Sequence, residues 1–138
     1  MKEVILHYHS IFMFLVFGVV SVCTIFGFYN WLKGKPYTKL HEVLSRTNIG
    51  IVHSQMLLGI ILMTHSANVN YGSNQPPNKI TDYWSYAHPA IMMAGIILVT
   101  LSLILVRNKK TDRQKHKLTF LFNILALLLV SVGIVMKP

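Results

Sequence analysis

Histidines are the residues of this 138-residue chain whose side chains could do chemistry, and four of them fall in or beside long apolar stretches. His53 lies well inside the apolar stretch 47–64, where an ionisable group costs free energy if the stretch crosses a bilayer. His9, His88 and His116 lie near one end of each of the other three apolar stretches. Imidazole is a common axial ligand of haem iron, and helix bundles hold such groups between facing side chains. A membrane haem site is therefore the first hypothesis.

Composition indicates a membrane protein. Hydrophobic residues make up 53% of the chain and charged residues only 12%, whereas soluble domains have about 25% charged residues. The formal net charge is +9, but the basic residues gather in two short connections, at 33–42 and 107–117. The preference of Lys and Arg for cytoplasmic loops explains this placement without a nucleic-acid partner.

Four apolar segments predict four membrane-spanning helices. We expect them at about residues 8–32, 45–65, 85–106 and 114–135. Short connections favour an all-α, single-domain, up-down-up-down four-helix bundle. With both basic connections on the cytoplasmic side, both termini lie outside. Thr38 and Ser85 are the expected N-caps of the second and third helices.

Depth in the membrane sorts the four histidines into two pairs. In such a bundle the first and third helices are diagonal, and so are the second and fourth. We expect His9 and His88 to meet near the outer face, and His53 and His116 to meet near the cytoplasmic face. Each pair would offer two axial nitrogens to one haem iron. The alternative is that a histidine at a helix end is interfacial and bonds water or lipid headgroups. The histidines outside these pairs are His7, His41 and His65, of which His41 is expected to be solvated.

The second predicted span carries polar residues on two sides. At about 100° per residue, His53 shares a face with Gly50 and Ser54. Asn48 and Gln55 share a nearly opposite face. We therefore expect protein, rather than lipid, on two sides of this helix.

Other cofactor and enzyme chemistry fits the sequence less well. No predicted span contains Asp or Glu, which excludes a di-iron carboxylate centre. Zinc usually takes four ligands, with Cys or carboxylates among them. The single Cys23 lacks the partner that a thiol–disulfide enzyme needs, and no Ser-His-Asp arrangement is present. No catalytic residue is predicted.

Five short motifs span nearly the whole chain. They are Leu6-His7-Tyr8-His9-Ser10, Lys35-Pro36-Tyr37-Thr38-Lys39, His53-Ser54-Gln55-Met56-Leu57-Leu58-Gly59, His88-Pro89-Ala90-Ile91-Met92-Met93 and Lys115-His116-Lys117. Together they resemble a family of small four-helix bacterial membrane proteins described as cytochrome b-like. The resemblance implies haem ligation by His9, His53, His88 and His116, and a multi-pass protein of the bacterial cytoplasmic (inner) membrane.

Two positions depart from the family's pattern. The family has an Arg soon after its first His-Ser, where this chain has residues 11–14 without one. It also tends to have a Glu before the histidine of the third span, where Ala87 stands here. Both departures lie beside the expected outer pair.

The leading hypothesis is a membrane-embedded protein that binds one or two b-type haems and transfers electrons between the quinone pool and a respiratory membrane partner. Ser54, Gln55 and Asn123 are candidates for contacts to the ligating imidazoles or to a quinone. One alternative is a cofactor-free accessory or structural subunit of a larger membrane complex. Another is a small transporter or channel subunit, which the absence of carboxylates from the spans disfavours.

Overall fold

Helices account for the secondary structure of the part of the chain that the computed structural model describes, residues 2–65 and 78–138. They are α1 (Lys2–Lys33), α2 (Lys39–His65), α3 (Lys79–Asp82), the π-helical segment η1 (Tyr83–Ala87), α4 (His88–Arg107) and α5 (Asp112–Val135). Four stretches are long and apolar enough to cross a membrane: Glu3–Lys33, Lys39–His65, Lys79–Arg107 and Asp112–Val135. The four predicted spans are thus confirmed as long apolar helices.

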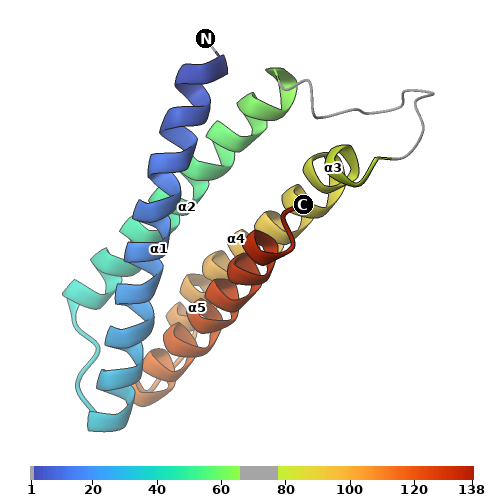
Figure 1. The fold of residues 1–138 in the computed structure, drawn as a ribbon. Coiled ribbons are helices and arrows are strands. Elements are labelled where there is room, and N and C mark those ends of the chain that lie inside the picture. The colour runs from blue at the N-terminus through green and yellow to red at the C-terminus, as the bar shows by residue number, and fades with distance from the viewer. Residues whose placement is uncertain (1, 66–77) are drawn as a thin grey trace.

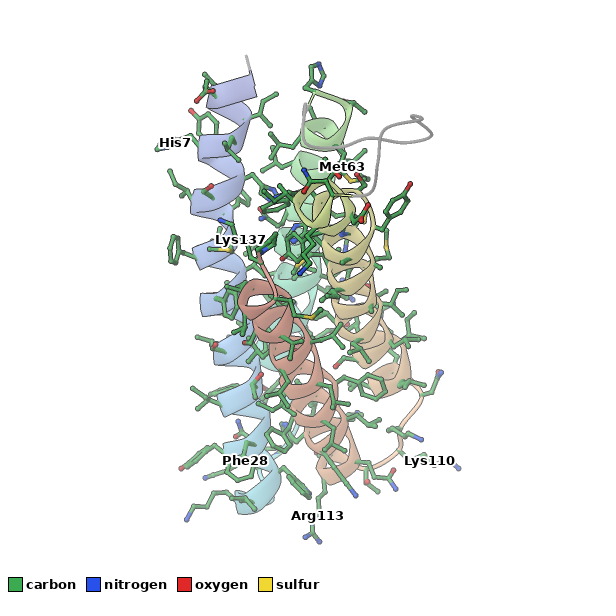
Figure 2. The ribbon with its side chains drawn as sticks, turned by 45° about the vertical axis from the view of Figure 1, so that its right-hand side comes forward. His7, Phe28, Met63, Lys110, Arg113 and Lys137 are labelled. Carbon is green, nitrogen blue, oxygen red and sulfur yellow. The ribbon has the colours of Figure 1, made fainter. Side chains whose placement is uncertain are left out.

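The long helices form a bundle of two antiparallel pairs, α1 with α2 and α4 with α5 (Figure 1). Contacts between α1 and α5 and between α2 and α4 join the pairs, so α1 lies diagonal to α4 and α2 diagonal to α5. Both termini lie at one end, which we call the terminal end. The connections 34–38 and 108–111 lie at the other, the basic end, where Figure 2 shows Lys110 and Arg113.

One buried residue from each long helix forms a layer near the middle of the bundle. The layer consists of Val20, Val52, Val99 and Ala126, each at most 5% exposed and all packed together. Because an α-helix rises about 1.5 Å per residue, this layer gives a common origin for depth along all four helices.

The predicted cap of the third span is wrong. Helical structure begins earlier, at Lys79, where the Asn78 side chain accepts a 3.0 Å hydrogen bond from the backbone N–H of Ile80. Ser85 is buried inside η1, where the backbone N–H of His88 donates to the carbonyl of Tyr83. Pro89 directly follows this wide turn. Because proline has no backbone N–H, Pro89 donates no hydrogen bond to the preceding turn.

The second helix begins where it was predicted, but protein does not cover both of its polar sides. α2 starts directly after Thr38, whose carbonyl accepts a 3.1 Å bond from the N–H of His41. Asn48 is buried on the face toward the other helices, whereas Gly50 and Ser54 are exposed. Within the described part of the chain, protein therefore covers only one of the two polar sides of α2.

Candidate functional site

His9 and His88 lie at the same depth on diagonal helices. His9 precedes Val20 by eleven residues on α1, and His88 precedes Val99 by eleven residues on α4. Both helices run from the terminal end toward the basic end, so both histidines lie about 16 Å from the central layer. Both side chains are half-buried. The structure thus brings the predicted outer pair to one level of the bundle.

Polar and small residues of α2 surround His9. The Gln55 side-chain Nε2 donates a 3.0 Å hydrogen bond to the His9 carbonyl and lies 3.5 Å from His9 Nε2. A side chain at Gly59 would place its Cβ 3.3 Å from His9 Cε1, so glycine gives the imidazole its space. His9 Nδ1 and Gln55 Oε1 are buried without a hydrogen-bond partner in the described part of the chain. This end of the core therefore contains unsatisfied polar atoms, which are costly in an apolar interior.

The π-helical segment η1 positions aromatic side chains around His88. The Tyr83 hydroxyl donates to the carbonyl of Gly133 on α5 and lies 3.5 Å from His88 Nδ1. The Trp84 ring lies 5.1 Å from the His88 ring, measured between centroids. π-Helical turns are frequent at functional sites. Here the turn directs two aromatic rings toward one imidazole.

The predicted inner pair is not brought together. His53 follows Val52 directly and so lies at the level of the central layer. His116 precedes Ala126 by ten residues, about 15 Å toward the basic end. His53 Nδ1 bonds the Ile49 carbonyl of its own helix at 2.9 Å. One haem iron cannot take both His53 and His116 as ligands in this arrangement.

His116 pairs instead with His41, which was expected to be solvated. The two ring centroids lie 4.7 Å apart in an edge-to-face contact, and Tyr37 packs within 5.2 Å of both rings. His41 is 9% exposed and His116 is fully buried. Such close ring contact leaves no space for a macrocycle between the two imidazoles. The expectation of a solvated His41 is therefore wrong.

The fold of the α1–α2 connection explains this burial. Gly34 has φ +61°, a conformation that favours glycine, and the chain turns there toward the end of the bundle. The Lys35 carbonyl accepts a 3.1 Å hydrogen bond from His116 Nε2. On α1, a Cβ at Gly27 would lie 3.0 Å from the backbone N of Phe120, so glycine allows α1 and α5 to approach closely. The connection and both helices thereby enclose His116.

Asn123 has a structural role in a hydrogen-bond network. Its Oδ1 accepts a 2.8 Å bond from Asn48, and its Nδ2 donates to the Thr119 carbonyl at 2.8 Å and to Ser102 at 3.5 Å. The Ser54 hydroxyl is exposed and bonds the Gly50 carbonyl of its own helix. Of the three residues predicted to contact a ligand or a quinone, only Gln55 touches a predicted haem ligand.

Comparison with protein families, with curated proteins and with solved structures finds no match for this chain. Among the described residues, no three His, Cys, Asp or Glu side chains gather closely enough to hold a metal ion. A haem needs fewer protein ligands than a bare metal ion does, because its macrocycle supplies the equatorial nitrogens. Of the two predicted pairs, only His9 and His88 lie at one level on diagonal helices.

Proposed function

We propose that this chain is a membrane-embedded b-type haem protein that transfers electrons, and that His9 and His88 hold one haem near the terminal end. The observation that supports the proposal best is the equal depth of these imidazoles on diagonal helices. Their half-buried positions also support it. His53 and His116 are left out, because they lie at different depths.

The surroundings of the two imidazoles suit ligands that must be held in one orientation. Gln55 would hold the backbone at His9 in place through its hydrogen bond to the His9 carbonyl. The Tyr83 hydroxyl would lie beside Nδ1 of His88. Polar neighbours of ligating imidazoles set ring orientation and tune the metal. Two protein ligands would leave no open iron position, so the bound haem would supply one-electron transfer rather than oxygen chemistry.

The resemblance to cytochrome b-like proteins and the basic connections support a location for the proposed activity. The chain would lie in the bacterial cytoplasmic membrane, with the basic end on the cytoplasmic side and both termini outside. The haem would then lie in the outer half of the membrane. Electrons would pass between the quinone pool and a respiratory membrane partner.

The visible absorption spectrum of the full chain, purified in detergent from haem-replete cells, tests this function. We expect a Soret band in the oxidised protein and sharp alpha and beta bands on reduction. A colourless preparation that is correctly folded, as judged by helical circular dichroism, would overturn the proposal.

The second candidate function, a cofactor-free subunit of a larger membrane complex, has one observation of its own. Gly50 and Ser54 are exposed four residues apart on α2, and a Cβ at Gly50 would meet nothing within 4 Å. Small residues at this spacing let membrane helices approach closely. His53 lies beside them, half-buried and in the middle of the span.

Native gels of gently solubilised membranes test this alternative. A subunit that docks through this face should migrate in a large complex, and Gly50→Leu should release it. Gly18→Leu is the matched control, because Gly18 also has open space around it but lies on α1. Identical migration of wild type and Gly50→Leu would contradict docking through this face.

A further inference from the structure

Residues of α1, α2, α5 and the connection 34–38 line a small pocket at the basic end. Three of its side chains have polar atoms without a hydrogen-bond partner among the described residues: Tyr37, His41 and His116. Its free volume is enough for about one water molecule. Neither of the proposed haem ligands, His9 and His88, lines this pocket.

Hydrogen bonds to the backbone fix the tautomers of both imidazoles. The Thr38 backbone N–H donates a 3.1 Å bond to His41 Nδ1, so Nδ1 carries a lone pair and Nε2 carries the proton of the neutral ring. His116 Nε2 lies 3.1 Å from the Lys35 carbonyl, which can only accept, so Nε2 carries the proton and Nδ1 a lone pair. Each ring therefore has one nitrogen committed to the backbone.

The two remaining nitrogens have complementary roles. His41 Nε2–H is a donor and His116 Nδ1 is an acceptor, and both are buried without a partner. The Tyr37 hydroxyl, a donor and an acceptor, is buried in the same pocket, where the Ser45 and Thr119 side chains interact with it. Leaving the two imidazole nitrogens unsatisfied would cost about 1–3 kcal/mol for each group. A water molecule can satisfy both and also bond the hydroxyl, because buried water typically makes about three hydrogen bonds.

We propose that this pocket binds one ordered water molecule that accepts a hydrogen bond from His41 Nε2–H, donates one to His116 Nδ1 and bonds the Tyr37 hydroxyl. The water joins the start of α2 to the start of α5 through two imidazoles, each of which is anchored to the backbone of the α1–α2 connection. It completes a hydrogen-bonded path from Thr38 to Lys35.

A metal ion of similar size fits the same pocket less well. Metal coordination needs a lone pair on the nitrogen, whereas the Thr38 bond leaves a proton on His41 Nε2. Water is neutral and requires no change of tautomer.

Nuclear magnetic resonance of the wild-type protein with ¹⁵N-labelled histidine, in detergent micelles, tests the proposal. We expect both His41 and His116 to be protonated at Nε2 and bare at Nδ1. We also expect the His41 Hε2 proton to show a cross-peak to a long-lived water molecule. Protonation of His41 at Nδ1 would overturn the proposal, and so would the absence of a cross-peak between the His41 Hε2 proton and water.

His116→Gln sharpens the test. A glutamine amide can still donate to the Lys35 carbonyl, but it does not reproduce the Nδ1 acceptor. The cross-peak between water and His41 Hε2 should be lost in this variant and kept in His65→Gln, the control at an exposed histidine. A cross-peak that survives in His116→Gln would contradict the bridge.

Addition of one equivalent of Zn²⁺ to the wild-type protein distinguishes the two occupants. The resonances of His41 and His116 should not move if the pocket holds water. A shift of both imidazoles in the wild type, with no shift of His41 in His116→Gln, would overturn water in favour of a metal ion. The wild-type spectra alone decide the question if the variant does not fold.

Discussion

The side-chain amide of Asn48 donates a 2.8 Å hydrogen bond to Oδ1 of Asn123, which joins the diagonal helices α2 and α5. Both side chains are only 2% exposed, and Asn123 also reaches Ser102 on α4. The network therefore connects three of the four long helices and sets their register. It lies between the central layer and the basic-end pocket.

Asn48→Ala should destabilise the bundle by about 1–3 kcal/mol, because it leaves Asn123 Oδ1 buried without a donor. The free energy of unfolding in mixed micelles measures this loss. A double-mutant cycle with Asn123→Ala should give a coupling energy of about 0.5–2 kcal/mol, the range of hydrogen bonds between membrane helices. Strictly additive single-variant losses would show that the two amides do not interact.

Gly27→Ala should destabilise the bundle by about 1–3 kcal/mol, because the new methyl group meets the backbone of α5 and forces the helices apart. The nearest atom, the backbone N of Phe120, would lie 3.0 Å from the added Cβ. Gly18→Ala is the control, since no atom lies within 4 Å of its Cβ position. It should be neutral or stabilising by up to about 1 kcal/mol, through helix propensity. Equal stabilities of the two variants would contradict the close approach of α1 and α5.

Tyr37 should make the protein less stable at alkaline pH. Burial is the main cause that raises the pKa of its hydroxyl above the ordinary value, which is about 10. Above that pH the unfolded chain loses the phenolic proton while the folded chain keeps it, so stability falls as the pH rises toward the folded-state pKa. The free energy of unfolding, measured at a series of alkaline pH values, should decrease less steeply with pH for Tyr37→Phe than for wild type. Parallel curves would refute a buried hydroxyl at this position.

The four long helices were predictable because a long apolar segment indicates a membrane span. The residues at which the helices begin were harder to predict. Thr38 was placed correctly as the residue before α2. Ser85 was not a cap, because helical structure begins after Asn78 and continues through η1 to Pro89. A proline in the first turn and a proline after a π-helical turn leave the same sequence signal.

The depth of His53 was misjudged because the sequence places a residue along its own helix but not relative to the other helices. In the structure His53 lies at the level of Val52 in the central layer, away from the basic end. Depth along one helix requires the register between helices, and here contacts such as Asn48 with Asn123 set that register.

His41 was missed because a histidine between basic residues is usually solvated. Its burial depends on Tyr37 and on the turn at Gly34, which brings the Lys35 carbonyl to His116. The spacing of each histidine from the central layer is nearly the same, but the layer itself is known only from the structure. His41 precedes Val52 by eleven residues and His116 precedes Ala126 by ten, so equal depth on the diagonal helices follows once the layer is known.

The haem-to-protein ratio of the wild type and of three single variants tests the central claim most directly. Pyridine haemochrome spectra measure the haem, and amino-acid analysis measures the protein. With His9 and His88 as the only axial pair, the wild type should bind one haem per chain, His53→Ala should keep it, and His9→Ala and His88→Ala should each lose it. Two haems per chain, or loss of haem from His53→Ala alone, would contradict this account.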